Sequence, residues 1–188
     1  MTIVQHTLHS SHREVLIEHL FVGEIMNCLW MRGVTQLEVL KPQVDDSGYD
    51  LVFELNAIMR HVQLKSSMNS AATAEVPASL NLLSKPGACV IWIQFDPATI
   101  QLGPFLWFGG VPGARMPDTA TLKIAKHSRA NANGVKAERP NHRVIPKRMF
   151  EKVDDIDGII ARLFGPLQIP APSSLAVDDE LDTSNESL

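Results

Sequence analysis

Apolar and polar residues alternate in two neighbouring segments of the chain. In "YDLVFEL" (49–55) apolar residues alternate with acidic ones, and in "IMRHVQLKS" (58–66) they alternate with Gln63 and Lys65. A period of two is typical of a strand with one polar face. We therefore expect two strands, joined by a tight turn at the intervening "NA".

A helical period precedes these strands. Apolar residues recur at helical spacing through "VLIEHLFVGEIMNCLWM", and Gly33 follows as a C-terminal cap, so we expect a helix over 12–32. Ser11 and Glu14 have the spacing of a capping box at its start. After Gly33, "VTQLEVL" (34–40) predicts a further strand.

The second half of the chain contains one strong strand and one strong helix. The run "ACVIWIQFD" (88–96) is apolar on both faces, which is typical of a strand in the middle of a covered sheet. A short helix with Pro77 in its first turn would precede it, and "PFLWFGG" predicts a later strand. Residues 111–148 are poor in apolar residues, which indicates loops and short strands. "DDIDGIIARLF" predicts a last helix capped by Asp154 or Asp155.

Composition and length indicate one globular domain. The chain has 188 residues, of which 45% are apolar and 20% charged. We expect a domain over 1–165 with its core in 12–110, followed by an acidic, disordered tail over 166–188. There is no apolar run long enough for a membrane span and no signal-peptide pattern, so we expect a cytoplasmic protein. The tryptophans expected in the core are Trp30, Trp92 and Trp107.

Charge is unevenly distributed along the chain. The net charge is −4 overall, but residues 123–152 contain nine basic and two acidic residues. Such a segment either contacts a polyanion or is a solvated loop that balances the acidic end of the chain. Within it, the stretch "KHSRANANGVKAERPNHRVIPKR" (126–148) has no interleaved aromatic residues, which favours phosphate contacts over base stacking. The expected nucleic-acid contacts are Lys123, Lys126, Arg129, Lys136, Arg139, Arg143 and Lys147.

Two groups of polar residues could carry chemistry. His6, His9 and His12 recur every three residues, but they lie before or at the expected helix start, so we do not expect them to group around a metal. Gln63 and Lys65 lie two apart on one strand and therefore share a face. That polar face could simply be exposed to solvent, or it could be a metal site.

The order of these residues resembles the PD-(D/E)XK nuclease superfamily, which has the restriction-endonuclease-like fold. The resemblance covers residues 20–96. The stretch "VGEIMNCLWMRGV" resembles the first-helix signature of the superfamily, with Glu24 nine residues before a glycine. The stretch "DDSGYDLVFE" resembles the strand that carries the metal-binding aspartate. The stretch "HVQLKSS" resembles the (D/E/Q)-X-K strand. Gln63 stands in place of the usual acid, as in one subgroup, and Tyr49 in place of the proline.

The resemblance implies a fold and an activity. The fold would be an α/β sandwich with a central mixed sheet of four to six strands flanked by helices, in the order α-β-β-β-α-β. The activity would be divalent-metal-dependent hydrolysis of nucleic-acid phosphodiesters, of DNA rather than RNA, through a metal-activated water.

Oxygen ligands suit the Mg²⁺ or Mn²⁺ that this chemistry requires. The resemblance makes Glu24, Asp50, Gln63 and Lys65 the catalytic set. The carboxylate of Asp50, the amide of Gln63 and the carbonyl of Leu64 would bind the ion, and Glu24 would bind a second ion or its waters. Lys65 would orient or help deprotonate the water, or stabilise the developing charge. The neutral Gln63 predicts weaker Mg²⁺ binding and a preference for Mn²⁺.

Neighbouring residues could support this site. Glu54, His61 and Ser67 are candidates for groups just outside it. Glu18 lies about 120° around the helix from Glu24, so the two would not serve one site.

Two alternatives to the nuclease stay open. The chain could have the same fold without catalysis and act as a nucleic-acid-binding or protein-interaction module. It could also be a plain sheet protein whose polar face is solvated. As a nuclease with one site per chain, it would need a homodimer to cut both strands.

Overall fold

The computed structural model describes residues 3–44, 47–127, 129–130, 132 and 134–167. The helices are α1 (Ile3–Leu8), α2 (Ser10–Trp30), α3 (Leu80–Leu83) and α4 (Ile156–Phe164), with a 3-10 turn η1 (Lys147–Met149). The strands are β1 (Glu38–Leu40), β2 (Leu51–Leu55), β3 (Ile58–Met68), β4 (Glu75–Ser79), β5 (Cys89–Phe95), β6 (Leu102–Gly109), β7 (Ile124–Lys126), β8 (Glu138–Pro146) and β9 (Glu151–Val153).

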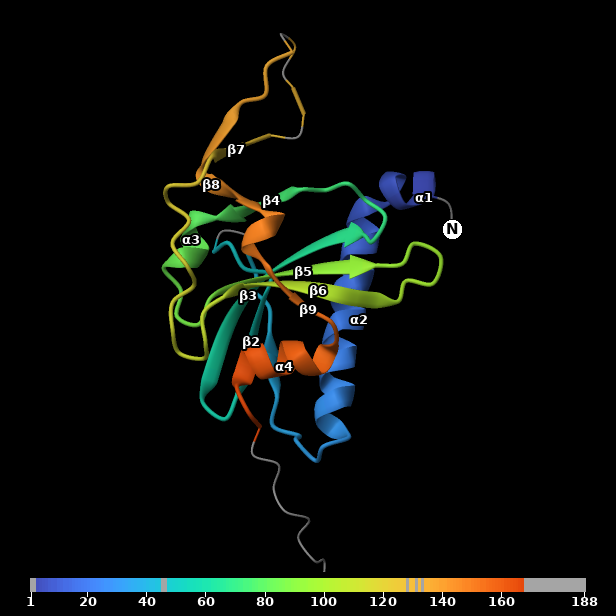
Figure 1. The fold of residues 1–188 in the computed structure, drawn as a ribbon, viewed down its shortest axis with the longest axis vertical. Coiled ribbons are helices and arrows are strands. Elements are labelled where there is room, and N and C mark those ends of the chain that lie inside the picture. Colours follow the sequence, from blue (N-terminus) through green and yellow to red (C-terminus); the bar gives the residue numbers. More distant parts are fainter. Residues whose placement is uncertain (1–2, 45–46, 128, 131, 133, 168–188) are drawn as a thin grey trace, which may run out of the picture.

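The strands form two sheets (Figure 1). The main sheet has six strands in the order β1-β2-β3-β5-β6-β9, and the small sheet has three in the order β4-β8-β7. Strands β3 and β5 are parallel, and every other neighbouring pair is antiparallel. The expected α/β architecture with a mixed central sheet of four to six strands is therefore confirmed, while the restriction-endonuclease-like fold stays a prediction.

The β2–β3 hairpin fixes the register of the polar residues. Its turn is formed by Asn56 and Ala57, both with positive φ, 50° and 63°, as a two-residue hairpin turn requires. Leu51 then pairs with Val62, and the backbone N–H of Asp50 donates to the Val62 carbonyl at 2.9 Å. This register places Asp50 beside β3 at the level of Gln63.

Helices α2 and α4 cover one face of the main sheet. The buried face of α2 consists of Ile17, Phe21, Ile25 and Leu29. These side chains share one core cluster with the apolar alternate residues of β2, β3 and β5 and with α4. The expected final helix is confirmed, because the Asp155 carboxylate accepts a hydrogen bond from the Gly158 N–H at the start of α4.

The small sheet and α3 cover the other face. A second core cluster joins Val90 and Trp92 of β5 with Leu106 of β6, Val76 of β4 and Ile145 of β8. Alternation along β3 turns Gln63 and Lys65 towards this second layer, since they pair with Val90 and Trp92. The polar face of β3 is therefore partly enclosed rather than open to solvent.

The start of the long helix differs from the prediction. Helix α2 begins at Ser10 after the N-cap residue His9, which makes no side-chain capping bond, so the Ser11–Glu14 capping box is wrong. Tertiary contacts fix this end instead. The His6 ring nitrogen Nε2 hydrogen-bonds to the Pro97 carbonyl at 2.8 Å, and Arg13 Nη1 donates to the His6 carbonyl at 2.6 Å.

Pro77 lies in a strand rather than in a helix. It is in the middle of β4 and pairs with Val144 of β8. Proline fits there because β4 is an edge strand of the small sheet, where an N–H on the outer side is not needed. Helix α3 starts three residues later, at Leu80, with the Ser79 hydroxyl accepting from the Asn81 N–H at 3.2 Å.

The tryptophans divide between core and surface. Trp92 and Trp107 are buried as expected, but Trp30 is 68% exposed. The expectation for Trp30 was wrong because it lies at the end of α2, on a side of the helix away from the sheet. A buried arginine was not anticipated: Arg60 stacks on Trp107 at 5.1 Å and donates to the Gly110 and Val111 carbonyls.

The predictions about membrane spans and about the C-terminal tail concern other parts of the chain. Within the described residues, no helix combines the length and apolar character that crossing a bilayer requires. Residues 168–188 of the expected acidic tail lie outside the described residues.

Candidate functional site

The site begins where one edge of β3 loses its strand partner. Strand β2 pairs with β3 only as far as Val62, whereas β5 pairs with the other edge up to Met68. At this point the carboxylate Oδ2 of Asp50 accepts a hydrogen bond from the Leu64 N–H at 2.6 Å. The Asp50 side chain thus takes the place of the next backbone rung of the ladder.

The Leu64 carbonyl points to the same edge. The N–H and C=O groups of one strand residue are directed towards the same neighbouring strand. Because the Leu64 N–H meets the Asp50 carboxylate, the Leu64 carbonyl oxygen faces the Asp50 side of β3 as well. Two of the predicted metal ligands therefore share this edge.

A cavity of about 280 Å³, the polar cavity, lies over the polar face of β3. It brings together three of the predicted catalytic residues, from β3 and from just before β2, with residues of the small sheet, of α3 and of the loop before Asp50. The polar cavity is lined by Gly48, Asp50, Gln63, Lys65, Pro77, Ser79, Asn81, Arg139, Asn141 and His142.

Gly48 allows this cavity to form. It has φ of +78°, and a Cβ at this position would be 2.6 Å from the Ser79 Cβ. A side chain is excluded by both the backbone angle and the close approach. The loop before Asp50 can therefore lie directly against the end of β4.

Gln63 carries an unsatisfied oxygen in this setting. The residue is 7% exposed, and its Oε1 is buried with no hydrogen-bond partner. A buried acceptor without a partner costs about 1–3 kcal/mol, so such atoms usually have a donor or a cation as a ligand. Gln63 and Asp50 line the same cavity, and an amide oxygen and a carboxylate are ligands that suit a hard divalent cation.

A second cavity of about 380 Å³, the acidic cavity, borders the first. Both cavities are lined by Asp50, Lys65 and Pro77. The acidic cavity adds Glu14 and Glu18 of α2 and Glu75 of β4, together with Ile17, Leu64, Ser66, Thr73 and Val76. Glu18 also forms an ion pair with Lys41. Asp50 and Lys65 therefore lie between the polar cavity and the acidic cavity.

Glu24 does not line either cavity. It lies one turn before Cys28, whose thiol donates to the Asp157 carboxylate of α4 at 2.8 Å, so this side of α2 faces α4. Burial raises the pKa of Glu24 above its ordinary value. The structure brings Glu14 and Glu18 to the acidic cavity, which Asp50 also lines.

Sequence reasoning missed Glu14 and Glu18 because it gave Glu14 a capping role that the structure does not have. Their spacing of four residues was the available signal, since it puts both carboxylates on one helix face.

The predicted supporting residues have structural partners. The His61 nitrogen Nδ1 hydrogen-bonds to the Pro86 carbonyl at 2.8 Å, and its ring meets Tyr49 edge to face. Ser67 accepts a hydrogen bond from Trp92 Nε1 at 2.9 Å. Glu54 lies towards the hairpin turn, opposite Met59. Neither Glu54, His61 nor Ser67 lines the polar or the acidic cavity.

One residue of the predicted basic segment reaches the polar cavity. Arg139 of β8 lines it, with Nη2 2.7 Å from the Nε2 of His142. A guanidinium only donates, so His142 Nε2 is the acceptor in this contact. The sequence gave no signal for His142 or Asn141, because a strand of the small sheet positions them.

Other residues of the basic segment have different surroundings. Arg143 donates to the carbonyls of Ala120 and Pro140, which indicates a structural role. Lys147 lies over the Trp92 ring at 5.6 Å. Arg129 is exposed.

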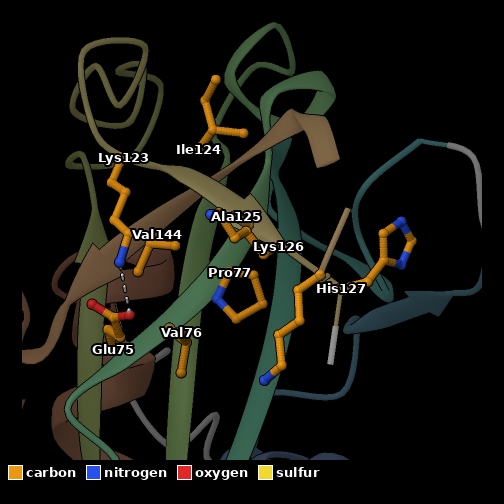
Figure 2. A pocket seen from close by; sticks show the side chains of 10 residues that line it. Glu75, Val76, Pro77, Lys123, Ile124, Ala125, Lys126, His127 and Val144 are labelled. Carbon is orange, nitrogen blue, oxygen red and sulfur yellow. Dashed lines mark ion pairs between the residues drawn. The ribbon is translucent and has the colours of Figure 1, made fainter. Parts of the chain in front are cut away.

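The remaining lysines border a groove on the small sheet, the basic groove, with a volume of about 320 Å³. In Figure 2, Lys123 points towards Glu75, and Lys126 and His127 extend on the other side of Pro77. The Lys123 Nζ and the Glu75 Oε1 are 4.0 Å apart. The groove is lined by Glu75, Val76, Pro77, Lys123, Ile124, Ala125, Lys126, His127, Lys136 and Val144.

Comparison of the chain with protein-family models, with curated proteins and with solved structures finds no match. Among the described residues, no group of three or more His, Cys, Asp and Glu side chains is arranged to hold a metal ion. A metal at Asp50 would therefore depend on amide and carbonyl oxygens for the rest of its protein ligands.

Proposed function

We propose that the chain binds a divalent cation at Asp50 and hydrolyses nucleic-acid phosphodiesters, with DNA as the substrate. The observation that carries this proposal is the buried, unpartnered Oε1 of Gln63, a residue that lines the same cavity as Asp50 and Lys65. A carboxylate, an unpartnered amide oxygen and a lysine on one partly enclosed face are unusual in a purely structural sheet, because a buried polar group without a partner is destabilising.

Three oxygen donors support the choice of metal. The Asp50 carboxylate, the Gln63 amide and the Leu64 carbonyl are the hard ligands that Mg²⁺ and Mn²⁺ prefer. A bound ion would supply Lewis acidity and lower the pKa of a water molecule. Because Gln63 is neutral, the three donors carry one formal negative charge, so we expect weaker Mg²⁺ binding than at an all-acid site and better activity with Mn²⁺.

Lys65 acts on the water and on the phosphate. Its ammonium group only donates hydrogen bonds, so it is not a ligand. It borders both cavities beside Asp50, where it orients the attacking water and stabilises negative charge that develops on the phosphate.

Arg139 and His142 bind substrate phosphate. Both line the polar cavity, and the guanidinium can donate two parallel hydrogen bonds to phosphate oxygens. These contacts hold the phosphodiester over the face that carries Asp50 and Lys65.

A second function, nucleic-acid binding without cleavage, is favoured by one observation. Among the described residues that line the polar cavity, Asp50 alone has a carboxylate, and the described part of the chain contains no cluster of three or more typical metal-ligating side chains. A site with so few charged ligands could hold a phosphate through Arg139 and Lys65 without cutting it.

Nicking of supercoiled plasmid DNA by the purified protein tests both functions. Wild type, Lys65→Ala and Lys152→Ala are incubated with Mn²⁺, with Mg²⁺ and with EDTA. Lys152 is the matched control, because it is an exposed lysine of β9 that forms an ion pair with Asp154. We expect metal-dependent nicking by wild type and Lys152→Ala, and a loss of about 100-fold or more for Lys65→Ala.

Equal nicking by wild type and Lys65→Ala would reject the catalytic proposal. Absence of nicking, together with DNA binding that is lost on Arg139→Ala, would support the binding function instead.

A further inference from the structure

An exposed apolar surface covers the outer side of the two N-terminal helices. Trp30 and Met31 are 68% and 77% exposed at the end of α2, and Leu8 is 73% exposed in α1. Trp30 alone exposes roughly 100–170 Å² of the 150–250 Å² that an aromatic side chain can bury. A large exposed apolar patch on a soluble protein marks an interaction site. The exposed apolar residues of this surface are Leu8, Val15, Leu16, Leu20, Met26, Trp30 and Met31.

Five residues form a line along this outer side of α2. Leu16, Leu20, Gly23, Asn27 and Trp30 are spaced alternately by four and three residues, which is the spacing of a helix–helix contact seam. A Cβ at Gly23 would meet nothing within 4 Å, so the fold of a single chain does not require glycine there. A glycine in the middle of an exposed helix costs about 1 kcal/mol relative to alanine, but it lets a second helix approach closely.

A cavity of about 360 Å³ adjoins one end of this line. Leu16 belongs to both the line and the cavity, which Pro97 and Ile100 also line. The cavity also includes Gln5, His6, His9, His12, Arg13 and Ala98. The protruding Trp30 lies at the opposite end of the line.

The exposed Trp30 and the cavity beside Leu16 lie at equal distances on either side of Gly23. Leu16 and Trp30 are each seven residues from Gly23, which corresponds to about 10 Å along the helix. If two α2 helices cross in antiparallel orientation with a two-fold axis at Gly23, Trp30 of each chain therefore lies opposite Leu16 of the other chain. The same contact is then made twice. Such self-complementarity is what an isologous dimer requires, and an unrelated partner would not need it.

We propose that the outer side of α2 is the interface between two copies of this chain. The two α2 helices cross in antiparallel orientation at Gly23. Trp30 of each protomer inserts into the cavity that Leu16 and Ile100 border in its partner. The inference is independent of the proposed nuclease function.

The dimer leaves the candidate site accessible. Glu14 and Glu18, which line the acidic cavity, lie on the opposite side of α2 from Leu16 and Leu20, about 160° around the helix on average. Each protomer would therefore keep an open site.

Sedimentation equilibrium combined with tryptophan fluorescence tests the dimer. Of the three tryptophans, Trp92 and Trp107 are buried, so a change in solvent quenching with protein concentration reports on Trp30. We expect a dimer mass at high concentration, with Trp30 becoming protected from a soluble quencher. Trp30→Ala and Leu16→Asp should each weaken dimerisation by about 30-fold or more.

Two further variants separate association from folding. Val111→Asp is the matched control for Leu16→Asp, since Val111 is 72% exposed and lies far along the chain in the β6–β7 connection; it should leave the dimer intact. Gly23→Leu should raise the thermal stability of the monomer while it weakens the dimer, because the monomer has space for the side chain. Monomeric wild type at all concentrations, or a dimer unaffected by Leu16→Asp, Trp30→Ala and Gly23→Leu, would overturn the proposal.

Discussion

The Asp50 carboxylate accepts a hydrogen bond from the backbone N–H of Leu64, with 2.6 Å between Oδ2 and N. The contact lies where β2 stops pairing with β3. It fixes the carboxylate at the open edge of β3, beside the side chains of Gln63 and Lys65. One side chain therefore completes the strand ladder and borders both cavities.

Substitution of Asp50 separates these two roles. Asp50→Asn keeps an oxygen that can accept from Leu64 but removes the charge, so we expect stability within about 1 kcal/mol of wild type and a loss of cleavage of about 100-fold or more. Asp50→Ala also leaves the N–H unpaired and should cost about 1–3 kcal/mol. Thermal denaturation and plasmid nicking measure the two effects. Full activity of Asp50→Asn would show that the carboxylate is structural alone.

Replacement of Gln63 tests the unpartnered oxygen. Gln63→Met removes a buried acceptor at similar length, so we expect the metal-free protein to gain up to about 1 kcal/mol. The rise in melting temperature on adding Mn²⁺ should disappear in this variant and grow in Gln63→Glu, because a ligand that binds the native state stabilises it. An unchanged Mn²⁺ effect in Gln63→Met would exclude Gln63 as a ligand.

We expect Glu24 to affect the pH dependence of folding stability and not the cleavage activity. Burial raises the pKa of Glu24 in the folded chain, so its contribution to stability is fully present below the unfolded pKa and is lost as pH rises through the folded pKa. Glu24→Gln should therefore stabilise the protein at neutral pH by less than about 1 kcal/mol, since the group is partly solvated, and have no effect below about pH 4. Melting temperatures at the two pH values measure this.

Glu18→Gln provides the comparison for the site. Glu18 lines the acidic cavity, and Glu24 does not line it. We expect Glu18→Gln to weaken Mn²⁺-dependent nicking and Glu24→Gln to preserve it. Loss of nicking in Glu24→Gln with normal nicking in Glu18→Gln would instead support the sequence-based prediction that Glu24 belongs to the site.

Removal of Arg139 should change the salt dependence of DNA binding. If the guanidinium contacts one phosphate, Arg139→Ala should lower the slope of log affinity against log salt by about one. Arg148→Ala is the matched control, because Arg148 is an exposed arginine of the same basic segment and does not line the polar cavity. Fluorescence anisotropy with a labelled duplex over a salt series gives the slopes. Equal slopes for the two variants would show that Arg139 does not contact a DNA phosphate.

The strands of the β2–β3 hairpin and the buried strand β5 could be predicted from the sequence, because their signals are local. A period of two over residues 49–66 and an all-apolar run over 88–96 depend only on neighbouring residues. Helix α4 was equally clear, since its cap and its apolar face lie within one short segment. The same alternation placed Gln63 and Lys65 on one face.

Weak local signals failed where long-range contacts decide the structure. Pro77 suggested a helix start, but pairing with β8, some seventy residues away, made its segment an edge strand. Ser11 and Glu14 have the spacing of a cap, yet the contact between His6 and Pro97 let the helix begin earlier. Local propensities of this kind are small compared with packing.

The sequence by itself determined that a carboxylate, an amide and a lysine share one face of adjacent strands, because alternation and a two-residue turn fix that register. The tertiary structure alone decided which other groups meet them. Strand β8 brings Arg139 and His142, and the rotation of α2 about its axis brings Glu14 and Glu18 in place of Glu24. The pitch of a helix tells which of its residues share a face, but packing against the rest of the protein sets which face meets the site.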